Sequence, residues 1–309
     1  MTTISSEHEA MISPRQWGII LLLLSPALLA SNVIIAKAVV EIVPPFSLAF
    51  SRWFVTALIM LPFVGAHLWR DRAVIKKEWK QLLVLGFLGM GICGAFPYIG
   101  AQTTSATNIG LIYAFSPIFI IVFSRIFYAV HLNKRQLVGV AFAFVGVVVI
   151  VAKGDIQILR ELRFTQGDLW IVGAAASWGF YSLWQGHLKS ELGLFLRFSA
   201  MTVGGAMVLL PFAAVELYQQ LPIVWDLQVA KTIFLTVIFL AVVSSIASYA
   251  AYAKIQTLLG ASIASLVMYA LPLYTAALAW LILDEQLQSF HFLGAILILP
   301  GLFLAASRK

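Results

Sequence analysis

The sequence predicts an all-α polytopic membrane protein, with ten transmembrane helices arranged as two inverted five-helix repeats. Three observations support this fold class: the apolar composition, the number of long apolar runs, and the charge of the loops between them. Of the 309 residues, 61% are hydrophobic and 11% are charged, and the mean hydropathy is +0.97. Soluble globular domains contain about 25% charged residues, so this chain belongs to the membrane class.

Each predicted helix is an apolar run long enough to cross a bilayer, which takes about 20 residues. Ten such runs follow one another, at 17–38, 46–69, 80–100, 107–129, 134–152, 168–189, 195–218, 231–252, 260–282 and 288–306. We expect 1–16 to be a cytoplasmic N-terminal tail, 153–167 an external linker between the repeats at 17–152 and 168–306, and 307–309 a C-terminal tail. Too little sequence remains between the runs to form a soluble catalytic domain.

Lys and Arg are concentrated on one side of the predicted membrane. With a cytoplasmic N-terminus, most of the 20 basic residues lie in cytoplasmic loops, including the cluster Arg70, Arg72, Lys76, Lys77 and Lys80. The positive-inside rule therefore predicts a multi-pass protein of the inner (plasma) membrane with both termini in the cytoplasm. The rule also accounts for the net charge of +7, so no nucleic-acid partner is expected.

An internal repeat appears when 106–151 is aligned with 261–306. Pro117 then meets Pro272, and Gly139 and Gly146 meet Gly294 and Gly301. Because each half has an odd number of spans, the second half must enter the membrane from the opposite side. The loop charges agree with this inversion, since a basic loop in the first half becomes an acidic one in the second. Inverted repeats around a midplane site are typical of secondary transporters.

Residues at matching places in both halves resemble a known family, the EamA-like branch of the drug/metabolite transporter superfamily. In the second half the resemblance rests on Gly260–Ser262, Leu271–Leu273, Ala277–Leu281, Glu285, Leu287, Gly294 and Gly301, and in the first on Ser31, Asn32, Lys37, Pro45, Arg52, Thr104–Ala106, Pro117, Gly139 and Gly146. One departure is Val130, which stands where the second half has Glu285. The resemblance implies two bundles, with the first, third, fourth, sixth, eighth and ninth helices around a central cavity.

The candidate substrate-binding residues are polar or aromatic side chains within the predicted spans, and Trp178, Tyr181, Ser244, Ser245 and Tyr269 are expected at or near mid-span. The candidates are Asn32, Arg52, Tyr98, Trp178, Tyr181, Ser244, Ser245 and Tyr269. Pro26, Pro117 and Pro272 lie at similar depths, and proline in a membrane helix frees a carbonyl that a polar cavity can satisfy. These prolines either bend helices beside the binding site or only kink packed helices.

Arg52 is the one strongly cationic group expected inside a span, about 10 Å inward from Pro45. It either binds a substrate carboxylate or extends outward to lipid phosphate. Asn32 hydrogen-bonds either the ligand or another helix. Other residues near span ends are expected to reach the headgroups: the cations Lys37, Arg125, Arg197 and Lys254, and the tryptophans Trp17, Trp53, Trp69, Trp79, Trp170 and Trp225.

The sequence lacks the motifs of nucleotide-driven pumps and of common hydrolases, and no Asp or Glu lies clearly within a span. We therefore expect a secondary transporter without enzymatic activity, cofactor or metal, whose partners are a small-molecule substrate and the bilayer and whose expected state is a monomer. The resemblance and the aromatic and serine lining favour export of amino acids, including aromatic and large apolar ones. The alternatives are a nucleoside or cationic-drug transporter and a non-transporting membrane scaffold.

Overall fold

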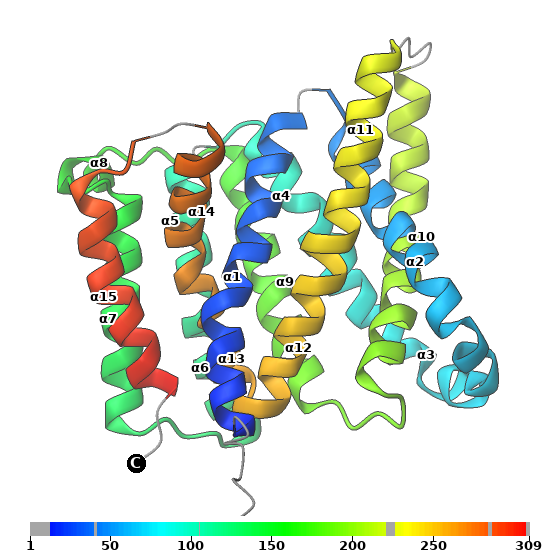
Figure 1. Cartoon of the computed structure of the whole chain (residues 1–309), viewed down its shortest axis with the longest axis horizontal. Helices are drawn as coiled ribbons and strands as arrows, with labels where there is room; N and C mark the ends of the chain where they lie inside the picture. The colour runs from blue at the N-terminus through cyan, green and yellow to red at the C-terminus, as the bar shows by residue number, and fades with distance from the viewer. Residues whose placement is uncertain (1–12, 40–41, 105, 221–225, 284–285, 307–309) are drawn as a thin grey trace, which may run out of the picture.

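The computed structural model describes residues 13–39, 42–104, 106–220, 226–283 and 286–306, and this part of the chain is a bundle of helices (Figure 1). The first half contains α1 (Pro14–Val39), α2 (Pro45–Arg70), α3 (Arg72–Gly86), the π-helical segment η1 (Phe87–Ile92), α4 (Cys93–Ala101), α5 (Ala106–Ala114), α6 (Ser116–Tyr128) and α7 (Lys134–Val151). After the short α8 (Ile156–Arg160), the second half contains α9 (Gln166–His187), α10 (Leu194–Gln219), α11 (Leu227–Phe239), the π-helical segment η2 (Leu240–Ala247), α12 (Ser248–Leu259), α13 (Ala261–Ala264), α14 (Val267–Leu283) and α15 (Ser289–Ala306).

Every predicted span coincides with one helix or with consecutive helices. Eight helical stretches in the described part are long and apolar enough to cross a membrane. The two remaining predicted spans fall on α1 and α9, which have 26 and 22 residues. The structure thus shows an all-helical multi-pass protein, while ten crossings and the inverted order of the two halves remain predictions. The predicted N-terminal and C-terminal tails lie almost entirely outside the described residues.

The helices extend beyond the apolar runs at several ends. The basic cluster near Arg72 was expected to lie in a loop, but α3 begins at Arg72 and only Asp71 separates it from α2. The first turns of α3 are amphipathic, since Lys76, Lys77 and Lys80 are exposed while Glu78 is buried. An amphipathic helix can therefore continue past the end of the apolar run. The 153–167 linker likewise contains α8, whose first turn is capped by Asp155.

Breaks and caps in the helices follow from local sequence. Asn133 and Gln136 form a reciprocal capping box at the start of α7, and Thr165 and Asp168 form another at the start of α9. Pro26 and Pro272 lie inside α1 and α14, as expected. Pro117 instead lies in the first turn of α6, directly after a break between α5 and α6, because its missing N–H is tolerated at a helix start.

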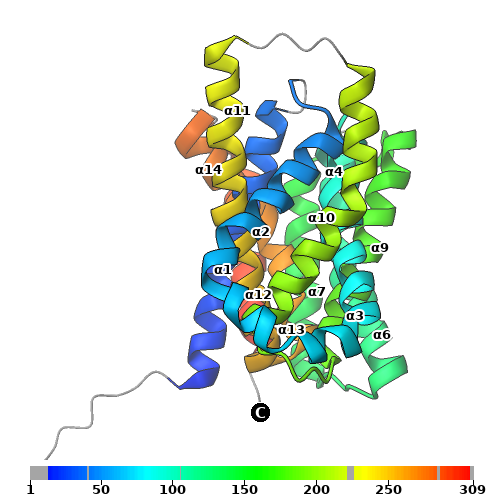
Figure 2. The same cartoon turned by 90° about the vertical axis from the view of Figure 1, so that its right-hand side faces the viewer.

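The packing of the bundle places helices of one half against helices of the other. The helix α1 contacts α12 and α14, while α9 contacts α4, α5 and α6, and α2 packs along α10. At one side, α7 and α15 lie next to each other (Figure 1), and the packing of α2 on α10 can be followed in Figure 2. The helices α7 and α15 approach so closely that a Cβ on Gly301 would come within 2.7 Å of the Gly139 carbonyl oxygen, and one on Gly146 within 2.9 Å of the Gly294 carbonyl oxygen.

The two faces of the bundle are distinguished by the ends of the chain. A hydrogen bond from Arg15 near the start of α1 to the carbonyl of Ala306 at the end of α15 joins both ends on one face (Figure 1). We call this the terminal face. On the opposite face α1 ends, α9 begins and α8 lies, and we call it the linker face.

Candidate functional site

The guanidinium of Arg52 is held in the interior of the bundle by neutral hydrogen-bond partners. Its Nε donates to Ser245 Oγ at 2.7 Å, and its Nη2 donates to the Ser244 carbonyl at 2.8 Å. Its Nη1 donates to Asn32 Oδ1 at 3.1 Å and to the Tyr98 hydroxyl at 3.3 Å, and Tyr98 also donates to Asn32 at 2.9 Å. These bonds join α1, α2, α4 and η2, and we call these five residues the arginine cluster.

Local structure explains why Arg52 lies in this position. It is two turns inside α2, and only 3% of its surface is exposed, so it does not extend to lipid headgroups. The π-helical winding of η2 alters the register of its backbone carbonyls, and the Ser244 carbonyl accepts from Arg52 as well as from Ser248. Such π-helical turns are often found at functional sites. The guanidinium also lies 4.7 Å from the centre of the Trp53 ring, a favourable cation–π contact.

The charge of Arg52 has no anionic partner within the described residues. No Asp or Glu oxygen of this part of the chain lies within ion-pair distance of it. Its four hydrogen bonds use four of about five N–H donors, and all the acceptors are neutral. Because a buried cation is costly without an anion, this arrangement favours binding of a negatively charged group.

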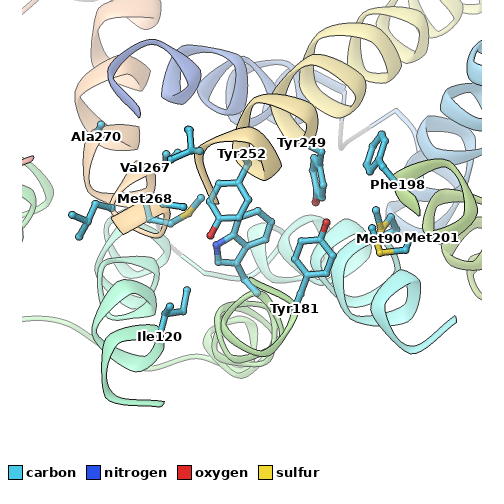
Figure 3. Close-up of a cluster of buried hydrophobic side chains, with 14 of the residues drawn as sticks. Met90, Ile120, Tyr181, Phe198, Met201, Tyr249, Tyr252, Val267, Met268 and Ala270 are labelled. Atoms are coloured by element: carbon cyan, nitrogen blue, oxygen red, sulfur yellow. The ribbon is translucent and has the colours of Figure 1, made fainter. Parts of the chain in front are cut away.

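A cluster of aromatic side chains adjoins the arginine cluster. It consists of Trp53, Trp178, Tyr181, Phe198, Tyr249 and Tyr252, and we call it the aromatic cluster. The ring of Tyr249 lies edge-on to Trp53 at 5.1 Å, and Trp178 lies 4.9 Å from Tyr252. Figure 3 shows Tyr181 and Tyr249 with their hydroxyl ends directed toward each other.

Several polar atoms of the aromatic cluster have no hydrogen-bond partner in the described part of the chain. Tyr249 donates to the Gly89 carbonyl at 2.9 Å, and Tyr252 is hydrogen-bonded to Ser182. The indole N–H of Trp178 and the hydroxyl of Tyr181 are buried and unpaired. Buried tyrosine and tryptophan normally pair these groups, so the cluster retains capacity to bind a polar ligand atom.

Tyr269 does not join the other predicted residues. Its ring is fully buried in α14 and packs edge-on to Phe144 of α7 at 6.2 Å, and its hydroxyl has no partner. The structure therefore brings seven of the eight predicted residues into two adjoining clusters and leaves Tyr269 apart. Whether any of the eight contacts substrate remains a prediction.

Two cavities lie at opposite faces of the bundle. The larger, of about 570 Å³, is at the linker face and includes Pro45, Trp170 and Glu216 in its lining. Glu216 is already engaged, since it accepts hydrogen bonds from the backbone of Phe46 and Ser47 at the start of α2. The smaller, of about 200 Å³, is at the terminal face. Neither is lined by the eight predicted residues, so the arginine and aromatic clusters form packed structure between the two ends.

Two expectations from the sequence are wrong. Trp53 was expected at the membrane interface, but its side chain is fully buried because the α2 face that carries it packs against α10 and α12. Arg197 was expected to reach the headgroups, but it is only 8% exposed and lines the smaller cavity. In contrast, Arg125 and Lys254 are exposed as expected, and the side chain of Lys37 lies outside the described residues.

Sequence reasoning did not select Trp53, Tyr249 or Tyr252 as candidate site residues. Tyr249 and Tyr252 are spaced i, i+3, which puts them on one helix face, and they follow Ser245 by about one and two turns. This spacing could have identified both tyrosines as neighbours of Ser245 from the sequence. The resemblance implied a centre without the second and seventh helices, but α2 contributes Arg52 and Trp53, and α10 contributes Phe198.

Fold and composition together define a multi-pass helical membrane protein, and comparison with known proteins identifies its family. The EamA-like transporter family matches residues 16–152 and again residues 165–307. The chain therefore belongs to the EamA-like transporter family and is a membrane transporter.

Several relatives cover nearly the whole chain. An uncharacterized transporter of Archaeoglobus fulgidus is 25% identical, covering 94% of this chain and 97% of its own length. The uncharacterized transporter YyaM of Bacillus subtilis is 24% identical, with 88% of each chain covered. A probable amino-acid metabolite efflux pump of Escherichia coli is 26% identical, covering 88% of this chain and 89% of its own. A crystal structure with 18% identity has a TM-score of 0.70 over 93% of this chain and 96% of that one, which supports the fold.

Proposed function

We propose that this transporter is a secondary exporter or facilitator, which carries amino acids, including aromatic and large apolar ones, across the inner membrane without enzymatic activity. The observation that carries the proposal is the pairing of a buried, anion-free guanidinium with an aromatic cluster that has unpaired polar atoms. Arg52 would bind the substrate carboxylate, and Trp178 and Tyr181 would contact its side chain. The relative named as a probable amino-acid metabolite efflux pump supports this substrate class.

Alternating access is supported by the cavities at both faces and the packed structure between them. In such a mechanism the centre opens to one face at a time. The inverted repeat supplies the two halves that move, and reciprocal contacts support it: α1 packs on α12 and α14, and the corresponding α9 packs on α4, α5 and α6. The aligned glycines of α7 and α15 also meet crosswise, as an antiparallel two-fold pair would place them.

The orientation that we propose places the terminal face in the cytoplasm. The basic residues of α3 and of the start of α7 lie on this face, which agrees with the positive-inside rule. Substrate would then enter by the smaller cavity and leave by the larger one. No carboxylate pairs with Arg52 in the described part, so coupling to a proton gradient is not expected to be strong.

Counterflow in proteoliposomes tests the proposal. Vesicles containing the purified full chain are loaded with unlabelled phenylalanine, and uptake of labelled phenylalanine is measured against protein-free liposomes. We expect uptake of the label to be inhibited by unlabelled phenylalanine added outside the vesicles. Phenylalaninamide, which lacks the carboxylate, should not inhibit it. An imposed pH gradient should change this uptake little.

The other outcomes separate the alternatives. Exchange of nucleosides or quaternary amines in place of amino acids would assign a different substrate class. Absence of exchange for amino acids, nucleosides and quaternary amines would support a scaffold without transport. Strong uphill accumulation driven by protons would refute the facilitator mechanism.

A further inference from the structure

The smaller cavity is lined by polar side chains that have atoms without a partner among the described residues. It lies between the terminal-face ends of α9, α10 and α12, and Gln185, Arg197, Gln256 and Thr257 are among its lining residues. Its volume of about 200 Å³ exceeds that of one water molecule, about 30 Å³, several-fold. The cavity is therefore large enough for a small organic molecule.

Arg197 is the cation of this cavity. Its Nε is buried without a hydrogen-bond partner among the described residues, and its Nη1 makes one long bond of 3.4 Å to the Leu188 carbonyl. Glu78 interacts electrostatically with Arg197, but Glu78 accepts hydrogen bonds from Ser190 Oγ and the Glu191 backbone. Within the described residues, no carboxylate lies at ion-pair distance from Arg197. A bound anion would supply the missing acceptor.

The backbone beside Arg197 also favours a negative charge. The helix α10 begins at Leu194, which lines the cavity, and its N-cap is Gly193, which provides no side chain to cap the helix. The first N–H groups of a long helix carry a partial positive charge that attracts anions. The guanidinium of Arg197 and the N-terminus of α10 therefore both favour binding of an anion.

Gln185 provides the opposite type of group in the same cavity. Its Oε1 is buried and accepts no hydrogen bond from the described residues, so a donor such as an ammonium group would satisfy it. Gln256 is fixed by bonds from its Nε2 to the carbonyl and hydroxyl of Ser182, at 2.8 and 3.1 Å. Two residues that line the cavity thus carry buried groups without a partner among the described residues, a donor on Arg197 and an acceptor on Gln185.

We propose that this cavity is a separate recognition site for the zwitterionic backbone of an α-amino acid, at the entrance to the transport path. Arg197 binds the carboxylate, and Gln185 Oε1 accepts from the ammonium group. This inference rests on the proposed transport function and adds an entry site to it. Ser182 connects the site to the centre, because it bonds both Gln256 of the cavity and Tyr252 of the aromatic cluster.

Cysteine protection on the purified full chain in detergent tests this site without requiring transport. Thr257 is an exposed residue of the cavity lining, and Cys93 is the only native cysteine, so Thr257→Cys in a Cys93→Ala background gives a single reporter thiol. The rate of maleimide alkylation is measured with alanine, phenylalanine, phenylalaninamide and 3-phenylpropionate as probes. We expect alanine and phenylalanine to slow alkylation and phenylalaninamide to have little effect.

Variants assign the two roles. Arg197→Gln should weaken protection by phenylalanine at least about tenfold, because a charge-assisted hydrogen bond is lost. Gln185→Leu should weaken protection by phenylalanine but not by 3-phenylpropionate, which lacks the ammonium group. Lys254→Gln removes a cation from α12 outside the cavity lining and should leave protection unchanged. Gln185→Leu keeps the proposal testable if Arg197→Gln fails to fold.

The outcomes separate this inference from the proposed function. Three results would overturn the entry site. The first is equal protection by phenylalaninamide, and the second is no protection by either amino acid. The third is protection that survives Arg197→Gln but is lost in Arg52→Gln. Arg197-dependent protection without any counterflow would leave the site standing and refute the transport proposal. Counterflow with no Arg197-dependent protection would support the transport proposal and refute the entry site.

Discussion

At the scale of single residues, two buried arginines, Arg52 and Arg197, form no ion pair in the described part of the chain, and we propose that transport depends on them. Arg52 is surrounded by neutral acceptors from three other helical segments, and Arg197 faces a cavity with one nitrogen unpaired. Burying such groups has a cost that neutral hydrogen bonds offset only in part. Both are therefore positions where a substrate anion would gain more than at the exposed cations of the surface.

Replacement of Arg52 tests its role in binding a carboxylate. We expect Arg52→Gln to raise the half-saturating concentration of phenylalanine in counterflow at least about tenfold, since it loses a charge-assisted hydrogen bond. Arg52→Lys should also be impaired, because one ammonium cannot bond Ser245, Asn32 and the Ser244 carbonyl in the same geometry. The matched control is Arg125→Gln, which removes an exposed cation from α6 and should behave as wild type. Normal phenylalanine affinity in a folded Arg52→Gln protein would contradict the role.

At the scale of elements, helix packing is controlled by small residues and by irregular helical segments. The glycines of α7 and α15 let the two backbones come into direct contact. Close packing of small residues is a common way to associate helices in a membrane, because lipid tails are as apolar as the side chains and no hydrophobic effect drives the helices together. The π-helical segments η1 and η2 occur at corresponding places in the two halves, and η2 carries both serines that bond Arg52. Close packing and altered helical register thus position the arginine cluster.

A glycine substitution between α7 and α15 tests this packing. A Cβ on Gly301 would lie 2.7 Å from the Ala143 nitrogen and 2.7 Å from the Gly139 carbonyl oxygen, so the backbones must separate. We expect Gly301→Ala to destabilise the protein by about 1–3 kcal/mol and to lower Tm in a detergent thermostability assay. Gly65→Ala is the matched control, because its Cβ would meet only a Leu61 side chain at 3.6 Å. Its Tm should be unchanged or slightly higher, since alanine favours helix more than glycine does. Equal Tm values for the two variants would refute the packing argument.

At the scale of the whole molecule, two half-chains interlock so that each contributes to the same central structure. Arg52 of the first half bonds η2 of the second, and Trp53 packs on Phe198 and Tyr249 of the second half. The termini meet on one face through Arg15 and Ala306. The even number of crossings that the sequence predicts would have this consequence, and it would place the larger and smaller cavities on opposite sides of the membrane.

Topology reporters test the orientation of the two faces. A reporter fused after Lys77 should be active only in the cytoplasm, and one inserted near Arg160 should be active only outside. The physical reason is that Lys and Arg are retained on the cytoplasmic side during insertion. Paired reporters, one active in each compartment, provide the control at each site. Both sites on the same side, or the reverse arrangement, would refute the proposed orientation.

The sequence by itself determined that the chain is helical and membrane-embedded, because span length and composition are local properties that need no knowledge of packing. Side-chain polarity, together with depth along the spans, also selected Arg52, Asn32, Tyr98, Ser244 and Ser245, which the structure brings together. Depth along a span does not tell how the helix is rotated about its axis, and this rotation decides which side chains face the interior of the bundle. Tertiary structure alone decided that Trp53 and Arg197 face inward and that Tyr269 packs apart from the clusters, since contacts between helices distant in sequence determine these directions.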